Sequence, residues 1–267
     1  MIRIVEPERI DGKKYTIESS SIYFSCIVND EADGIIWADR EKDPDFLLIW
    51  SPYQEGFQLM GKPLERQEWK KFRSWFDNTI PAFLAEREME DFEYGADTQE
   101  LANMFKEIFQ DKEYFSEKQK IFYWSERKNN IKLPEGYEVK QIDRAFFKQE
   151  YKDTQFITEE ITTAYGVLEP YFSHGIAYVA VKGKEIVARA DMLFSNALYG
   201  NISVNTKEQH RRKGLSAYLT IKAIEDTCKL GITPIWDCSE NNLASEKTAE
   251  KCGFKKARED IIYWFQI

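Results

Sequence analysis

The segment that most constrains the fold is residues 202–219, which read as a strand, a short basic turn and a helix. Three consecutive basic residues open the turn: Arg211, Arg212 and Lys213. Gly214 and Ser216 follow, and their small side chains allow a ligand to approach the backbone closely. Such a turn presents successive N–H groups at a helix N-terminus, where the helix dipole favours a pyrophosphate. The segment therefore predicts an anion-binding turn, and a surface turn that caps a helix is the alternative.

The elements after this turn follow a definite order. Residues 215–231 have apolar positions at helical spacing and stop at a glycine. Residues 232–239 read as a strand, and residues 242–245 form the turn after it. A helix then ends in Gly-Phe at residues 253–254, before an apolar strand at residues 261–265. This alternation of helices and strands predicts an α/β domain.

The basic turn carries a family resemblance. Arg211-x-x-Gly214-x-Ser216 is similar to the Gln/Arg-x-x-Gly-x-Gly/Ala loop of the GNAT acyltransferases, with serine in the last small position. The order of elements after the loop is also that of the family. The C-terminal half therefore resembles a GNAT domain, which implies an α/β (α+β) fold with a central mixed sheet flanked by helices. The strand around Asp237, the turn after it and the long N-terminal extension resemble the subgroup with the zwittermicin A resistance acetyltransferases.

The resemblance implies acetyl-CoA as co-substrate and assigns residues to it. Backbone groups of strand 202–206 would hold the pantetheine arm, and N–H groups of the turn would hold the pyrophosphate. Asn242 stands where the family often has an asparagine that touches the cofactor, and Ser245 lies nearby. As an alternative, Asn242 caps the next helix and Ser245 lies in its first turn. The implied cofactor-binding residues are Val204, Asn205, Thr206, Arg211, Arg212, Lys213, Gly214, Leu215, Ser216, Ala217, Asn242 and Ser245.

The sequence gives only weak signals for which residues are catalytic. Acyl transfer from a thioester to an amine mainly needs the two reactants positioned, because the thioester is already activated. Asp237 is the candidate catalytic base and Asp191 is the other carboxylate considered, with a structural role as the alternative for each. Many GNAT enzymes place a tyrosine acid four residues before the glycine of Gly-Phe, where this chain has Ala249. His174 reads as a loop residue.

Residues 129–136 are polar, contain proline and glycine, and predict a boundary between domains 1–130 and 131–267. Both halves end in a helix and an aromatic strand, so the first is either a degenerate GNAT-like half or an ordinary smaller α/β domain. The first half contains no basic phosphate turn, so we expect it to bind no cofactor in this way and to shape the acceptor site. Expected strands before the boundary are residues 21–28, 34–38, 46–50, 57–60 and 121–124, and expected helices are 64–76, one beginning at Pro81, and 101–109. After it we expect strands 137–142, 176–181, 185–194 and 199–206, and a helix over 144–151.

Composition narrows the partners. Two histidines and four cysteines without a Cys-x-x-Cys pair predict no metal site and reduced thiols. The charged N-terminus is unlike a signal peptide, and the longest apolar run, residues 176–181, is too short to cross a bilayer, so we expect a cytoplasmic protein without a membrane partner. Residues 1–130 hold 18 Lys and Arg against 27 Asp and Glu, whereas residues 131–267 hold 19 of each. This balance disfavours nucleic acid, and the acidic half either attracts a cationic amine or only confers solubility.

The leading functional hypothesis is an N-acetyltransferase that moves an acetyl group from acetyl-CoA to a primary amine of a small molecule, with an amine-bearing antibiotic as one candidate. The alternatives are a non-catalytic acyl-CoA-binding regulatory module, or a transferase of another acyl or aminoacyl group. An edge strand near the C-terminus could pair with a second copy, which makes a homodimer a candidate assembly.

Overall fold

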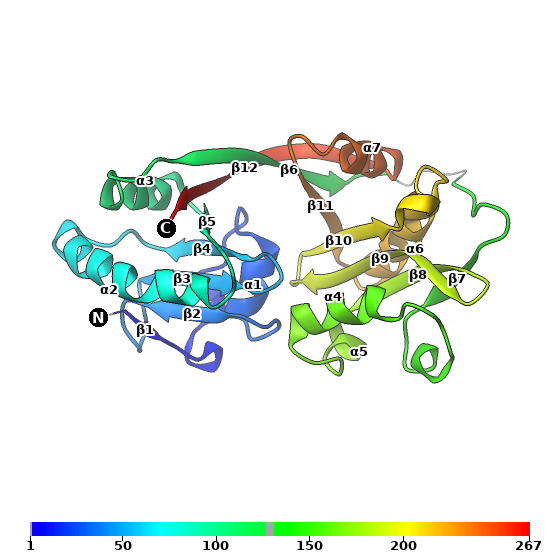
Figure 1. Ribbon diagram of the computed structural model, residues 1–267, viewed down its shortest axis with the longest axis horizontal. Coiled ribbons are helices and arrows are strands. Elements are labelled where there is room, and N and C mark those ends of the chain that lie inside the picture. The colour runs from blue at the N-terminus through cyan, green and yellow to red at the C-terminus, as the bar shows by residue number, and fades with distance from the viewer. Residues whose placement is uncertain (1, 127–130) are drawn as a thin grey trace. The chain divides into compact units, whose positions relative to one another are not determined.

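The computed structural model describes residues 2–126 and 131–267, in two compact units (Figure 1). The first unit is Met1–Lys118 with Asp260–Ile267, and the second is Gln119–Glu259. These units differ from the expected domains because the last strand of the chain belongs to the first unit, and residues after 118 belong to the second. Of the expected linker 129–136, residues 129 and 130 lie outside the described residues.

The first unit is a mixed sheet with the strand order β1-β2-β3-β4-β5-β12. β4 and β5 are parallel, and the other neighbouring pairs are antiparallel. Its strands are β1 (Arg3–Ile4), β2 (Ile35–Ala38), β3 (Phe46–Ser51), β4 (Gly56–Gly61), β5 (Asp91–Ala96) and the end of β12 (Phe254–Gln266). Its helices are α1 (Ile22–Val28), α2 (Arg66–Ala85) and α3 (Gln99–Ile108).

The core of the first unit is aromatic. Phe72 and Phe76 of α2 pack against Phe46, Phe92 and Phe105 with ring centroids 4.9–6.0 Å apart where they meet. β3 is buried over its whole length because α2 and α3 pack on one face of the sheet while α1 contacts the strand as well. A strand buried on both faces loses the polar-apolar alternation and reads as a continuous apolar run.

Two predictions in this unit are wrong. Residues 21–28 form a helix, α1, rather than a strand; a short apolar run fits either element, and here all seven helical residues are buried. Pro81 does not begin a helix but lies inside α2. A proline inside a helix costs about 3 kcal/mol. The helix continues because Ile80 and Leu84 are fully buried on either side of it, and burial of two such side chains contributes roughly 3–6 kcal/mol.

The second unit is also a mixed sheet, with the order β6-β11-β10-β9-β8-β7. Only the pair β10–β11 is parallel among the register pairs of this sheet in the described residues. Its strands are β6 (Phe115–Trp124), β7 (Glu138–Gln141), β8 (Ile176–Lys182), β9 (Glu185–Ser195), β10 (Tyr199–Thr206) and β11 (Thr233–Ser239). Its helices are α4 (Gln155–Tyr165), α5 (Tyr171–His174), α6 (Leu215–Lys229) and α7 (Leu243–Lys251).

The hairpin β8–β9, strand β10, helices α6 and α7 and strand β11 match the predictions, whereas β12 begins seven residues before the expected strand 261–265. The helix expected over residues 144–151 is reduced to a 3₁₀ turn at Phe146–Lys148. The sequence analysis did not anticipate α4 and α5. These two helices contact β9, and Tyr165 and Tyr171 bury their rings there while their hydroxyls donate to the carbonyls of Leu193 and Ile142.

The two units repeat one topology. In each, four antiparallel strands lead through a helix to a strand parallel to the fourth, and a second helix and a further strand follow. The further strand is exchanged: β6 follows α3 in the chain but pairs with β11, whereas β12 follows α7 but pairs with β5. The N-terminal half is therefore a second unit of the same α/β kind, as its weak internal similarity suggested.

Candidate functional site

β10 and β11 diverge next to the basic turn. Their parallel ladder runs from Tyr199↔Thr233 to Asn201↔Ile235. Beyond these pairs, in the described part of the chain, β10 continues along β9 and β11 continues along β6 (Figure 1). The register of β10 also shifts between Asn201 and Ser203, as at a β-bulge. The unpaired backbone edges of two diverging strands can hydrogen-bond an extended ligand placed between them.

The two faces of this part of the sheet differ in chemistry. Ile202 and Trp236 point to the side of α6 and α7, where they join the apolar core. Side chains alternate along a strand, so Asn201 and Asp237 lie on the opposite face. There the amide Nδ2 of Asn201, which is buried, donates a hydrogen bond to Oδ1 of Asp237. A carboxylate is thus fixed at the point where the strands separate, and it could accept a proton from an ammonium group.

The turn between β10 and α6 has the backbone that the sequence predicted. Gly214 is the N-cap residue of α6 with φ 86°, and Arg212 has φ 60°. No side chain of the described residues caps this helix, so its first N–H groups remain available to an anion. An added Cβ at Gly214 would meet only Nζ of Lys251, 4.0 Å away. The turn is therefore open on the side of its glycine.

Hydrogen bonds of side chains hold the turn in shape. The hydroxyls of Thr206 and Ser216 lie 2.8 Å apart, and Nε of Arg211 donates to the carbonyl of Thr206 at 3.0 Å. Nζ of Lys213 donates to the carbonyl of Gln209 at 3.0 Å. The basic side chains therefore lie beside the turn, and those of Arg211 and Lys213 also hydrogen-bond its backbone.

A buried histidine lies behind the turn. Nδ1 of His210 is 2.8 Å from the hydroxyl of Tyr137, and Nζ of Lys213 donates to the same hydroxyl at 3.2 Å. Burial, and then the nearby positive charge of Lys213, lower the pKa of His210. The neutral form of His210 is therefore favoured, and its contact with Tyr137 supports the loop.

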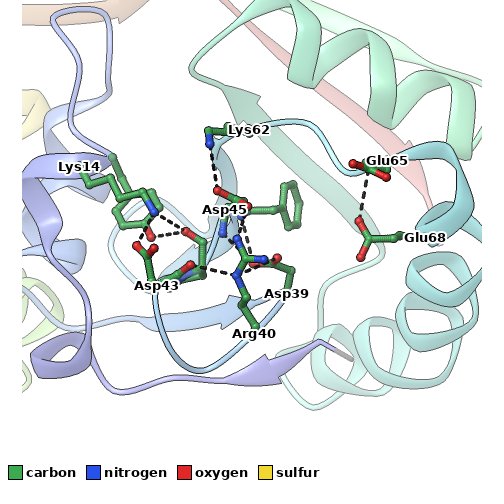
Figure 2. A network of polar contacts seen from close by, with 11 residues as sticks. Lys14, Asp39, Arg40, Asp43, Asp45, Lys62, Glu65 and Glu68 are labelled. Atoms are coloured by element: carbon green, nitrogen blue, oxygen red, sulfur yellow. Dashed lines mark hydrogen bonds and ion pairs between the residues drawn. The ribbon is translucent and has the colours of Figure 1, made fainter.

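The matching helix in the first unit, α2, is capped by its own side chains. There α2 begins with a capping box, in which Glu65 accepts from the backbone of Glu68 and the backbone N–H of Glu65 donates to the Glu68 carboxylate at 3.3 Å (Figure 2). Two carboxylates thus occupy the N-terminus of α2, whereas the N-cap and first turn of α6 carry no acidic residue. The ladder between β4 and β5 also continues past its last strand pair, because the N–H of Asp97 donates to the carbonyl of Leu59 at 3.1 Å.

A polar network in the same unit holds the loop between β2 and β3. Lys14 pairs with Asp43 at 2.5 Å, and both Arg40 and Lys62 pair with Asp45 (Figure 2). Asp39 accepts from the backbone N–H of Asp45 at 3.0 Å. These exposed ion pairs order a loop, and screening by solvent keeps their contribution to stability small.

The remaining predicted residues have defined places. Val204 is half-buried on the side of α6, Asn205 is exposed, and Thr206 is buried against Ser216. Leu215 and Ala217 are buried in the first turn of α6, and their backbone N–H groups belong to its uncapped end.

Asn242 caps α7 as the alternative reading expected. Its side-chain oxygen accepts from the N–H of Ser245 at 3.1 Å, and the Ser245 hydroxyl accepts from Nε1 of Trp236 at 2.9 Å. Both residues therefore have a structural role, and their contact with a cofactor stays a prediction.

Asp191 is a poor candidate for a base that meets substrate. It is fully buried on β9, where Arg189 binds its carboxylate and Glu160 of α4 binds the other side of Arg189. Burial raises the pKa of Asp191 to about 6, although Arg189 opposes the shift. Of the other positions considered, Ala249 is buried inside α7 and His174 is exposed at the end of α5.

Asn201 was not anticipated as a site residue. The only signal in the sequence is a polar residue inside a strand, and strands carry such residues on their solvent face as well. Its partner lies 36 positions away, so the hydrogen bond to Asp237 depends on the parallel pairing of β10 with β11.

The described residues contain no cluster of His, Cys, Asp and Glu able to hold a metal ion, and their cysteines are free thiols. None of the helices in residues 2–126 and 131–267 has the length and apolar character needed to span a bilayer.

Solved structures share this fold over nearly the whole chain. A GCN5-related N-acetyltransferase-like protein from Streptococcus suis 89/1591 is 19% identical with a TM-score of 0.62, and the match covers 93% of this chain and 94% of that protein. A tandem GNAT protein from the clavulanic acid biosynthesis pathway is 10% identical with a TM-score of 0.60, covering 100% of this chain and 98% of the other. Such a likeness agrees with two repeated units.

Among curated proteins, an uncharacterized N-acetyltransferase, YdfB, of Bacillus subtilis (strain 168) is 27% identical over 137 residues. That match covers 51% of this chain and 51% of the relative, so the chain spans about half the length of the curated relative it matches. The family model for GNAT acetyltransferases matches residues 14–263, which include both units. Together with the diverging strands and the basic turn, this match shows that the chain belongs to the GNAT acetyltransferase family.

Proposed function

We propose that this protein transfers an acetyl group from acetyl-CoA to a primary amine of a small molecule. The single observation that carries the proposal is the uncapped N-terminus of α6, with basic residues beside it, directly after the strand that diverges from β11. The N-terminus of this helix suits a pyrophosphate. The unpaired edges of the two diverging strands beside it suit an extended arm that carries amide groups. Acetyl-CoA supplies an activated thioester.

The residues present fit acetyl-CoA. The N–H groups from Arg212 to Ala217 would hold the pyrophosphate, and the freed backbone of β10 around Val204 and Thr206 would bind the pantetheine arm. The carboxylate of Asp237 lies where these strands separate and would take the proton of the amine, directly or through a water molecule. Asn201 would keep that carboxylate in place.

The test is an acetyl-transfer assay that follows release of coenzyme A, with Asp237→Asn as the variant. If Asp237 is the base, the rate at neutral pH should fall by about 10²–10⁴, while the affinity for coenzyme A stays within about twofold. Glu250→Gln, which changes an exposed carboxylate on α7, is the matched control and should keep the wild-type rate. A wild-type rate in Asp237→Asn would leave Asp237 with a structural role only.

A second candidate, a module that binds acyl-CoA without catalysis, is favoured by one observation. Ala249 is buried within α7 where many relatives have the tyrosine acid, so no hydroxyl is available there to protonate the leaving thiolate. Binding of coenzyme A without transfer to any amine would support it. The zwittermicin A resistance subgroup, an antibiotic acceptor, a cytoplasmic location and a homodimer stay predictions.

A further inference from the structure

Ser203 and Asp191 are neighbouring side chains on the polar face of the second sheet. Ile202 joins the apolar core on the side of α6, and side chains alternate along a strand, so Ser203 of β10 points to the opposite face. Asp191 of β9 is its register partner, and Cβ atoms of residues paired in this way lie about 4.5–5.5 Å apart. Ser203 is half-buried, whereas Asp191 is fully buried and its Oδ1 has no hydrogen-bond partner among the described residues. A buried acceptor without a partner is costly, and a proton or a hydroxyl donor relieves that cost.

The groups around Asp191 set its affinity for a proton. Arg189 binds Oδ2 of Asp191, and Glu160 of α4 binds the other side of Arg189, so one cation lies between two carboxylates. Tyr165 of α4 and Tyr171 of α5 donate their hydroxyl protons to backbone carbonyls. Burial raises the pKa of Asp191 to about 6, opposed by Arg189 and assisted by Glu160. A carboxylate with this pKa can take up and release a proton near neutral pH.

Ser203 lies where the reactive end of the proposed acyl donor would be. The last register pair of β10 with β11 is Asn201↔Ile235, and Ser203 is the next residue of β10 on the same face as Asn201. A pantetheine arm that leaves the turn before α6 and follows the backbone of Thr206 and Val204 brings its thioester to this point. A serine hydroxyl donates one proton and accepts at two lone pairs, so Ser203 can contact the reacting atoms and Asp191 at once.

We propose that Ser203 is a catalytic residue and that Asp191 acts through it, so that together they carry a proton from the attacking nitrogen to the sulfur of coenzyme A. The inference rests on the proposed function and adds a second proton transfer to it. Asp237 deprotonates the ammonium group before attack, whereas this transfer follows attack. A proton returned through Ser203 also replaces the acid that α7 lacks at Ala249.

The transfer is needed because the nitrogen must lose a proton and the sulfur must gain one. When the neutral amine adds to the thioester carbon, a C–N bond forms and the nitrogen becomes positively charged. The nitrogen gives its proton to Oγ of Ser203 while the proton of Ser203 moves to Oδ1 of Asp191. When the C–S bond breaks, its electron pair stays on sulfur, which takes a proton from Ser203, and Asp191 returns its proton to Ser203. Both residues end as they began.

The test measures acetyl transfer by the full chain from acetyl-CoA to whichever of propylamine, 2-phenylethylamine and spermidine the wild type acetylates fastest. Ser203→Ala should lower kcat by about 10²-fold or more, while the affinity for coenzyme A stays within about twofold. Ser203→Thr keeps a hydroxyl in the strand and should keep most of the rate. Ser116→Ala changes an exposed strand serine outside the site and is the matched control, with the wild-type rate expected.

Two readouts separate this proton transfer from a structural role. The double variant Ser203→Ala with Asp191→Asn should lose about as much rate as the more damaging single change, because both remove the same step. The rate of the wild type relative to Ser203→Ala should rise with pH as Asp191 ionises around its pKa of about 6. This ratio cancels the titration of the amine itself.

Three outcomes would contradict the inference and leave the proposed function intact: a wild-type rate in Ser203→Ala, losses that add in the double variant, or a ratio that stays constant between about pH 5 and 8. Transfer to none of the three amines, with coenzyme A still bound, would refute the proposed function itself. Calorimetry with coenzyme A shows that each variant is folded. If Asp191→Asn does not fold, the pH dependence of the ratio decides alone.

Discussion

The proposed binding of the pyrophosphate by the turn before α6 can be tested with the two glycines that flank this helix. Gly214 precedes α6 with φ 86° and Gly231 follows it with φ 77°. A Cβ added at Gly231 would meet no atom within 4 Å, and at Gly214 only Nζ of Lys251 at 4.0 Å. Gly214→Ala and Gly231→Ala therefore impose the same backbone strain without a clash inside the protein.

The expected loss of stability is the same for both variants. An L-residue in the left-handed region costs about 1–2 kcal/mol, which lowers Tm by about 2–4 °C per kcal/mol in a unit of this size. Binding should separate them. A methyl group at position 214, or any shift of the turn that relieves its strain, displaces N–H groups aimed at the pyrophosphate. We expect the Kd for coenzyme A to rise at least about tenfold, or ~1.4 kcal/mol, in Gly214→Ala alone.

The assay is isothermal titration calorimetry with coenzyme A, beside thermal unfolding of each variant. Gly231→Ala controls for strain at an end of α6, so a loss of affinity in both variants would mean that general destabilisation is the cause. Wild-type affinity in a folded Gly214→Ala variant would refute the assignment of the turn to the pyrophosphate. Gly214→Val extends the series, because its larger side chain should weaken binding further.

Two further predictions concern the buried carboxylate and the first unit. The pKa of Asp191 in the folded protein is raised from 3.8 to about 6, so the folded state binds the carboxyl proton more tightly than the unfolded state does. The stability gained from this proton is complete below pH 3.8 and is lost as the pH rises to about 6. Urea unfolding between pH 4 and 7 should show the stability of the wild type falling relative to Asp191→Asn by up to about 1.4 kcal/mol per pH unit in this window, and parallel profiles would contradict the assignment. Glu65 and Glu68 occupy the N-terminus of α2, so titration should give one coenzyme A per chain. Glu65→Ala should lower the stability by about 1 kcal/mol without creating a second site. A stoichiometry of two would show that the first unit binds coenzyme A as well.

The local structure of the second unit was largely predictable from the sequence. Around α6, short-range features agree with one another: a glycine at each end, apolar residues at helical spacing, and basic residues before the first turn. Each of these acts within a few residues, so pattern reading identifies the helix and the turn before it. The resemblance to GNAT enzymes rests on the same segment, and the family match confirms it.

Local patterns failed where burial decided the outcome. The apolar residues 22–28 suit a strand or a helix equally, and packing against the sheet makes them α1. Pro81 signals a helix start, but the buried residues around it carry α2 through the proline. Neither segment's own sequence predicts its structure here, because the outcome depends on the surfaces of the other elements against which the segment packs.

Tertiary structure alone decided the connectivity and the site. The exchange of β6 and β12 between units requires pairing of strands more than 100 residues apart, which no short-range pattern encodes. In the same way Asn201 meets Asp237 only because β11 pairs with β10. The sequence by itself determined where an anion could bind, through backbone geometry set by neighbouring residues. The polar groups of the candidate site come from separate strands, and only the order of those strands in the folded sheet brings them together.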